Sequence, residues 1–165
     1  MSVFIPPLNF GMVEDDLYRC GQPNELNFPF LEKLELKTVI WLAPDEPSEA
    51  FQNFLDEQGI ETFHLGMSDH YQNPWNPVSE DMVIEALAKI LDKSHYPIAV
   101  CCNLGRHRTG TVIGCLRKYQ RWNLTSILDE YRRYAGQKVR LLNEQFMELF
   151  DTDLVSAPDN APEWL

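Results

Sequence analysis

The chain has 165 residues, of which 44% are hydrophobic, and this is enough for one domain with a proper core. No apolar run approaches the roughly 20 residues that a membrane-spanning helix needs, and the first residues lack the charged-then-apolar layout of a signal peptide. The net charge of −11 argues against general binding to nucleic acid or to an anionic membrane.

The expected elements follow from the spacing of apolar residues and from capping and turn residues. In chain order they are an irregular lead-in over 1–16, a strand at 17–20, a helix at 24–36, a strand at 38–42, a helix at 48–58, a strand at 61–65, a loop at 66–78, a helix at 79–91, a strand at 97–102, and helices at 109–121, 125–134 and 142–150. Residues 151–165 are expected to form a loosely attached acidic tail. No repeat or linker divides the chain, so we predict a single domain over residues 1–165.

Strands that alternate with helices predict an α/β fold, with a central, mostly parallel sheet of about four to five strands flanked by helices. In such sheets, ligands bind beyond the carboxyl ends of the strands. The strand at 97–102 ends at Cys102, and the loop at 66–78 follows another strand. We therefore expect these two segments to meet in one pocket.

The segment 97–110 combines an apolar strand, a short polar loop and the start of a helix. Cys102 ends the strand, and Arg108 follows six positions later, so the two side chains can close around one tetrahedral anion. The loop amides, the positive end of the helix and the guanidinium fork all favour phosphate. The positive electrostatic field of these groups also favours the thiolate form of Cys102. We therefore predict that Cys102 is a nucleophile and forms a phosphocysteine intermediate. This is the chemistry of a cysteine-dependent phosphatase.

The loop has two other possible interpretations. Cys102 would be a plain buried strand cysteine if the basic turn had no ligand. A rhodanese-like sulfur carrier also uses a cysteine loop, but Arg108 followed by Thr-Gly fits phosphate better. Only Cys102 is in frame with an arginine, because the residue six positions after Cys101 is His107.

The four cysteines have no regular spacing, which predicts a reducing compartment, the cytoplasm, rather than a disulfide framework. No Cys/His cluster has the spacing of a zinc site. We expect neither a metal ion nor any other cofactor.

A leaving group in phosphoryl transfer needs a proton, and a carboxylic acid on a neighbouring loop is the usual donor. Asp69, just after the strand at 61–65, is the best-placed candidate, although a turn-forming Asp is an equally ordinary role. His70 is an alternative donor. The Thr109 hydroxyl is expected to hydrogen-bond the sulfur of Cys102, or to cap the helix, and it can do both.

The expected substrate-binding residues come from the loop and from a later basic segment. They are Asn103, Leu104, Gly105, Arg106, His107, Lys138 and Arg140. Residues 101–140 contain nine Arg and Lys residues but two acidic ones, a net charge of +7 in a chain of −11. An acidic protein with one basic segment suggests a compact, highly charged substrate, although part of this charge is an ordinary solvated helix face.

The chain resembles the plant and fungal atypical dual-specificity phosphatases, which belong to the cysteine phosphatase superfamily. The resemblance covers roughly Pro7 to Asp151. Within the family, the chain is most similar to the fungal branch linked to oxidant-induced cell-cycle arrest. The resemblance rests on residues 27–31, 36–40, 102–110, 114–118, 122–125, 129–133, 138–140 and 145–146. It implies a dual-specificity phosphatase fold, Cys102 as nucleophile, Arg108 as phosphate clamp, and contacts from Lys138 and Arg140 to further phosphates.

The chain departs from the family pattern at three positions. Cys101 stands where the family usually has a His that supports the thiolate, so weaker activity is expected. Leu104 replaces a basic residue, which removes one cation from the rim of the site. Asn73 stands before Pro74-Trp75 where the acid loop usually has Glu, so the resemblance does not transfer the general acid.

Three functions remain open from the sequence. The first is an active phosphatase that removes the β-phosphate of an inositol pyrophosphate. The second is a tyrosine or dual-specificity phosphatase that acts on phosphoproteins. The third belongs to another class: a weakly active or inactive phosphate-binding scaffold in a complex of related phosphatase-like proteins.

Overall fold

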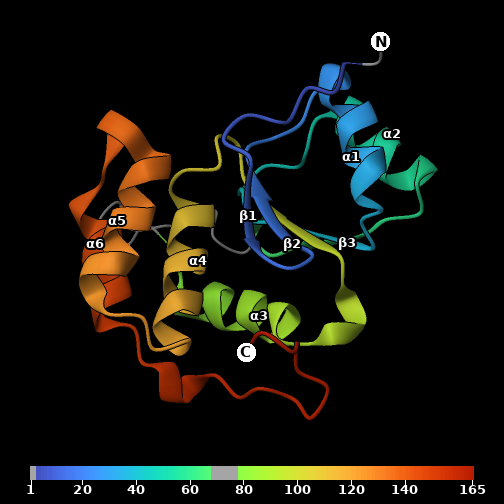
Figure 1. Cartoon of the computed structure of the whole chain (residues 1–165). Coiled ribbons are helices and arrows are strands. Elements are labelled where there is room, and N and C mark those ends of the chain that lie inside the picture. Colours follow the sequence, from blue (N-terminus) through green and yellow to red (C-terminus); the bar gives the residue numbers. More distant parts are fainter. Residues whose placement is uncertain (1–2, 68–77) are drawn as a thin grey trace.

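A computed structural model describes residues 3–67 and 78–165 and contains a sheet with helices on both faces (Figure 1). The strands are β1 Gly11–Glu14, β2 Leu17–Cys20, β3 Thr38–Trp41, β4 Glu61–His64 and β5 Ile98–Cys101. The helices are α1 Phe28–Leu34, α2 Glu49–Glu57, α3 Glu80–Ile90, α4 Arg108–Tyr119, α5 Leu124–Ala135 and α6 Leu141–Leu149. No helix in these described ranges is both long and apolar enough to cross a membrane.

The sheet has the strand order β1-β2-β5-β3-β4, which puts β5 at its centre. The pairs β2–β5, β5–β3 and β3–β4 are parallel, and β1–β2 is antiparallel. The predicted mostly parallel sheet is therefore confirmed. The edge strand β1 was not predicted, because only Val13 of its four residues is buried and the segment lacks a strand-like alternation.

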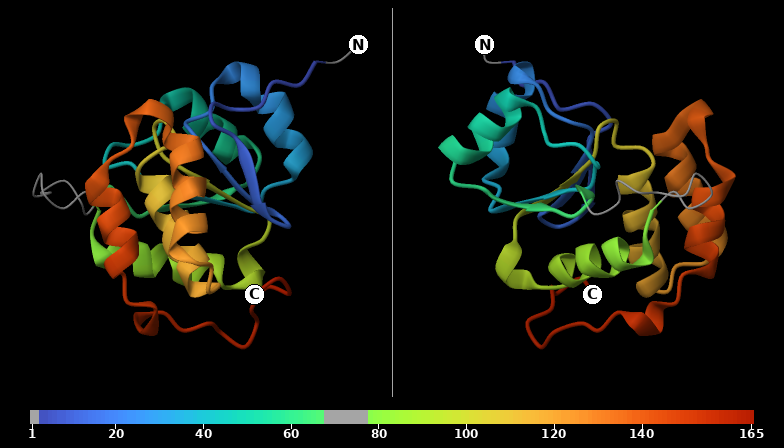
Figure 2. Two further views of the ribbon diagram at one scale, coloured as in Figure 1. Left: turned by 60° about the vertical axis from the view of Figure 1, so that its left-hand side comes forward. Right: turned by 180° about the vertical axis from the view of Figure 1, so that it is seen from behind.

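Alternate residues of the central strands face two separate cores. Ile98 and Val100 of β5 pack with helices α3 to α6, whereas Ala99 and Cys101 pack with α1 and α2. The two groups of helices lie on opposite faces of the sheet in Figures 1 and 2. All four residues of β5 are buried, as expected for a central parallel strand covered on both faces.

Most predicted helices are present, but the one predicted at 24–36 is interrupted. A 3-10 turn, η1 Glu25–Asn27, precedes α1, and Asn24 and Asn27 cap each other's backbone. Ser48 and Ser79 accept hydrogen bonds from the first turns of α2 and α3, as the sequence predicted.

The C-terminal residues run beneath α3 in Figure 1 and contact the body of the protein. The Lys93 amide donates to the Asn160 carbonyl at 2.9 Å, and the Trp164 ring packs against Tyr96 with centroids 6.4 Å apart. Val155 is 7% exposed and joins the core on the α3 side.

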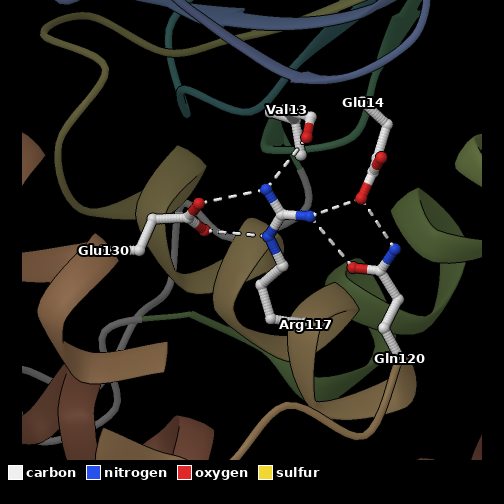
Figure 3. Close-up of polar contacts among 5 residues, drawn as sticks. All are labelled: Val13, Glu14, Arg117, Gln120 and Glu130. Atoms are coloured by element: carbon white, nitrogen blue, oxygen red, sulfur yellow. Dashed lines mark hydrogen bonds and ion pairs between the residues drawn. The ribbon is translucent and has the colours of Figure 1, made fainter. Parts of the chain in front are cut away.

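A buried arginine, Arg117 of α4, joins three elements (Figure 3). Its Nε and Nη2 donate to the Glu130 carboxylate of α5 at 3.1 and 3.0 Å. Its Nη1 donates to the Glu14 carboxylate at 2.7 Å, and Nη2 also reaches the carbonyl of Val13 in β1. Because its side chain is only 4% exposed, these contacts fix α5 and β1 against α4 in an environment with little water.

Replacing Arg117 with methionine should lower the free energy of unfolding by about 3 to 5 kcal/mol, because it leaves the buried Glu130 without a partner. Urea unfolding followed by circular dichroism measures the change. Lys93→Met is a matched control that breaks the Lys93–Glu163 pair, whose side chains are 51% and 90% exposed, and it should cost clearly less. Equal losses in the two variants would contradict the structural role given to Arg117.

Candidate active site

The loop between β5 and α4, residues 102–107, lies at the carboxyl end of the central strand. Gly105 has φ +69° at the middle of this loop. A Cβ at that position would lie 2.6 Å from the Gly21 nitrogen and 2.7 Å from the Cys20 carbonyl carbon. Only glycine fits, because the loop is pressed against the end of β2 and has a backbone conformation that other residues rarely adopt. The loop is thus built as a tight, fixed turn.

Cys102, the expected nucleophile, begins this loop and is 5% exposed. The Thr109 hydroxyl donates to its sulfur at 3.0 Å, so the contact predicted from the sequence is present. His107, not Thr109, occupies the N-cap position of α4. The positive end of α4 therefore begins directly after the loop and favours an anion there.

Arg108, the expected phosphate clamp, is held from outside its own helix. Its Nη1 donates to the carbonyl of Leu42, just after β3, at 3.1 Å and lies 3.9 Å from the sulfur of Met82 in α3. The side chain is half-buried. These contacts fix the guanidinium beside the loop, where its fork can bind two oxygens of one phosphate.

A polar network joins the loop to the segment between α5 and α6. The Nδ1 of His107 is 3.1 Å from the Tyr131 hydroxyl, and the same hydroxyl accepts from Asn143 Nδ2 at 2.9 Å and from the Arg140 amide at 3.1 Å. Tyr131 and Asn143 are buried. Figure 1 places the α5–α6 connection and the start of α4 at the same end of the helix layer. The network therefore positions the backbone of Arg140 at the catalytic loop.

The surroundings of His107 determine its protonation state. Its Nδ1 is the ring nitrogen that faces the network, 3.1 Å from the Tyr131 hydroxyl and 3.2 Å from Asn143 Nδ2. Burial and the positive charges of Arg140 and Arg106 lower the pKa of His107 to about 4. His107 is therefore a neutral hydrogen-bond donor at neutral pH.

The remaining predicted binding residues reach solvent, and those of the loop, with Arg140 joined to His107 through Tyr131, form the rim of the site. Asn103 and Leu104 are exposed, Arg106 is half-buried, and Lys138 and Arg140 are exposed. The Asn103 carbonyl accepts from the Gln22 amide at 3.0 Å, which ties the loop to the segment after β2. The rim is thus open to solvent and carries positive charge from two chain segments.

Cys101, which departs from the family pattern, points to the other face of the sheet from Cys102. Its sulfur lies 3.3 Å from that of Cys20 on β2, and both residues are 1% exposed. The hydrogen bond to Cys20 and burial raise the pKa of Cys101, so it is a neutral thiol. Cys101 belongs to the core under α1 and α2 and does not line the loop.

The predicted general acid, Asp69, lies outside the described residues. The same holds for its alternative, His70, and for Asn73 and Trp75 of the same segment.

Sequence analysis missed three residues at the site: Arg19, Tyr131 and Asn143. Arg19 Nη2 donates to the Gly105 carbonyl at 3.2 Å. Each of the three carries a polar group that is buried, and Arg19 stands in the otherwise apolar strand β2. That was the available signal, because buried polar groups need specific partners.

Comparison with known proteins agrees with this geometry. A model of the tyrosine phosphatase family matches residues 4–165. The chain belongs to the tyrosine phosphatase family. The protein named "Probable tyrosine-protein phosphatase DG1060" of Dictyostelium discoideum is 71% identical over 165 residues, covering all of this chain and 98% of its own. The OCA1 protein of Mycosarcoma maydis is 58% identical, covering 93% of this chain and 97% of its own.

Solved structures place the fold among cysteine phosphatases. The core catalytic domain of the PP-IP phosphatase SIW14 from S. cerevisiae matches with a TM-score of 0.84 and 41% identity, covering 92% of this chain and 90% of that domain. TpbA of P. aeruginosa, at 20% identity and a TM-score of 0.70, shares the fold. The resemblance to atypical dual-specificity phosphatases is confirmed, and the protein is a phosphatase of the phosphoric-ester hydrolase class.

Proposed function

We propose that the protein removes the β-phosphate of inositol pyrophosphates through a phosphocysteine at Cys102. The observation that carries the proposal is the set of guanidinium groups around the loop. Arg108 directly follows the loop and is anchored to the Leu42 carbonyl, Arg106 lies in the loop, and the Arg140 amide is joined to the loop through Tyr131 and His107. One arginine is enough for a monophosphate, whereas three arginines from the loop, the start of α4 and the start of α6 suit a ligand that carries several phosphates.

The Cys102 sulfur attacks the β-phosphorus and breaks its bond to the bridging oxygen. The loop amides and Arg108 bind the non-bridging oxygens, whose charge is spread in the transition state. The leaving group is the phosphate on the inositol ring, which needs less protonation than an alkoxide, and Asp69 is the proposed donor. Water then cleaves the phosphocysteine, and the Thr109 hydroxyl stabilises the departing thiolate.

The choice of an inositol pyrophosphate is supported by the 41% identity to a PP-IP phosphatase over almost the whole chain. The Tyr131–Asn143–His107 network supports it further, because it brings the basic segment at 138–140 to the loop. A ligand with only one phosphate would not use this connection.

A second candidate is a phosphotyrosine phosphatase. Leu104 exposes 48% of its surface on the loop, and an apolar rim residue suits an aromatic ring better than a phosphate. The test is phosphate release from a diphosphoinositol polyphosphate and from a phosphotyrosine peptide, measured side by side.

Arg140→Gln should lower kcat/KM for the diphosphoinositol substrate by about tenfold, because it removes a charge-assisted contact to a second phosphate. The same change should alter kcat/KM for the phosphotyrosine peptide by no more than about twofold. Arg133→Gln, on the exposed side of α5, is the matched control and should leave both values unchanged.

Release from the peptide alone would contradict the proposed substrate and favour the second candidate. An absence of any release that depends on Cys102 would instead favour the phosphate-binding scaffold within a complex of related proteins. Equal losses on both substrates in Arg140→Gln would show that Arg140 serves the loop rather than a second phosphate.

A further inference from the structure

Arg19 of β2 is a buried cation behind the catalytic loop, and it is 1% exposed. Its Nη2 donates to the Gly105 carbonyl at 3.2 Å. Its guanidinium carbon lies 3.7 Å from the centroid of the Tyr134 ring, a cation–π contact. The signal in the sequence is an arginine inside the otherwise apolar strand 17–20, which does not by itself point to the loop.

Within residues 3–67 and 78–165, no carboxylate forms an ion pair with Arg19. Its Nε and Nη1 are buried without a hydrogen-bond partner in the described part of the chain. The charge of Glu130 raises the pKa of Arg19, but both carboxylate oxygens of Glu130 accept hydrogen bonds from Arg117 (Figure 3). Burial lowers the pKa of Arg19 to about 10, so it remains a cation at neutral pH. An unpaired buried cation destabilises the fold, which calls for a compensating function.

The position of Arg19 indicates a role at the loop 102–107 rather than in the hydrophobic core. Gly105, whose carbonyl it holds, is the residue with the forced backbone conformation at the middle of the loop. A Cβ built on Gly110 would lie 3.7 Å from Arg19 Nη2, so the guanidinium also lies against the first turn of α4. Cys102 lies in the same loop, three residues before Gly105, whose carbonyl Arg19 holds.

We propose that Arg19 is a positioning residue that supplies positive charge to the loop from inside the protein. It stabilises the Cys102 thiolate and the phosphoryl group bound there, and it holds the Gly105 carbonyl so that the loop amides face the phosphate. A charge has a larger effect across this interior than across water because the effective dielectric constant is lower. The inference rests on the proposed role of Cys102 as nucleophile.

Other charged or titratable groups also face this region. In the part of the chain that the structure describes, these groups are Cys20 on β2, Cys101 on β5, His107 in the loop, Arg108 and Arg117 on α4, and Glu130 and Tyr134 on α5. Arg108 is the cation expected to bind the phosphate. The test therefore changes Arg19 alone and keeps Arg108.

Alkylation of Cys102 by iodoacetamide at varied pH, followed by mass spectrometry of the Cys102 peptide, measures where the thiolate forms. Arg19→Gln removes the charge and keeps an N–H donor for Gly105, and its alkylation midpoint should rise by about one pH unit. Arg19→Lys keeps the charge and should retain the wild-type midpoint. Arg133→Gln makes the same change in net charge on the exposed side of α5 and should also retain it.

The urea midpoint of Arg19→Gln should be unchanged or higher than that of wild type, because an unpaired buried charge has been removed. An unshifted alkylation midpoint in folded Arg19→Gln overturns the proposal. So does loss of folding in both Arg19→Gln and Arg19→Met, because Arg19 would then be a structural residue. The alkylation assay contains no phosphorylated substrate. Its result therefore does not depend on whether the protein hydrolyses inositol pyrophosphates.

Discussion

Cys102→Ser should reduce turnover of every phosphorylated substrate by about a thousandfold or more, because the hydroxyl is a far weaker nucleophile than the thiolate. The buried sulfur at the start of the loop is the group that the Thr109 hydroxyl contacts. The variant should still bind inorganic phosphate, since the loop amides, Arg108 and the start of α4 are unchanged. Steady-state phosphate release and phosphate binding by calorimetry measure the two effects.

Cys115→Ala is the matched control for this substitution. Cys115 lies on α4 and is completely buried in the core, and burial raises the pKa of its thiol. It should therefore retain wild-type kcat at a temperature where it is folded. Appreciable turnover in Cys102→Ser, or loss of turnover in folded Cys115→Ala, would contradict the assignment of the nucleophile.

Arg108→Lys should lower kcat/KM by about a hundredfold although the charge is kept. A lysine cannot bind two phosphate oxygens with a planar fork while another of its N–H groups donates to the Leu42 carbonyl. The loss should fall mainly on kcat, because the fork matches the spread charge of the transition state better than the ground state.

Kinetics with both candidate substrates measure this effect, and inhibition by vanadate reports the affinity of the loop for a transition-state-like anion. Arg106→Lys, at the half-buried rim position next to His107, should cause a much smaller loss. If the two lysine variants were equally active, Arg108 would not be the phosphate clamp.

Much of the fold could be predicted because its signals are local. The strands β2, β3 and β5 are short, apolar and separated by helical patterns, which implies a parallel sheet covered on both faces. The edge strand β1 escaped prediction because it has one buried residue and is defined by its partner, β2. Local sequence carries little information about such pairing.

The site was predictable to the extent that it is contiguous in sequence. Cys102, Arg108 and Thr109 lie within eight positions of one another, and their spacing alone indicates an anion loop. The supporting residues Arg19, Tyr131 and Asn143 come from β2, α5 and α6. Only the folded chain brings these three side chains to the loop.

The role of Cys101 illustrates the same limit. The resemblance to the family predicts weaker activity, because Cys101 stands where a His usually supports the thiolate. The alternation of side chains along β5 instead directs Cys101 into the core under α1 and α2, against Cys20. Arg19 supplies positive charge from the neighbouring strand, which a reading of adjacent residues cannot reveal.

The most direct test of the account is to trap the phosphoenzyme. Wild-type protein is mixed with excess substrate, quenched in acid within milliseconds, digested, and analysed by mass spectrometry. We expect one phosphoryl group on the peptide that contains Cys102, absent in Cys102→Ser and more abundant when Thr109 is replaced by valine, which slows the second step. Turnover without this phosphopeptide, or with the phosphoryl group on another residue, would contradict the central claim that Cys102 performs the chemistry.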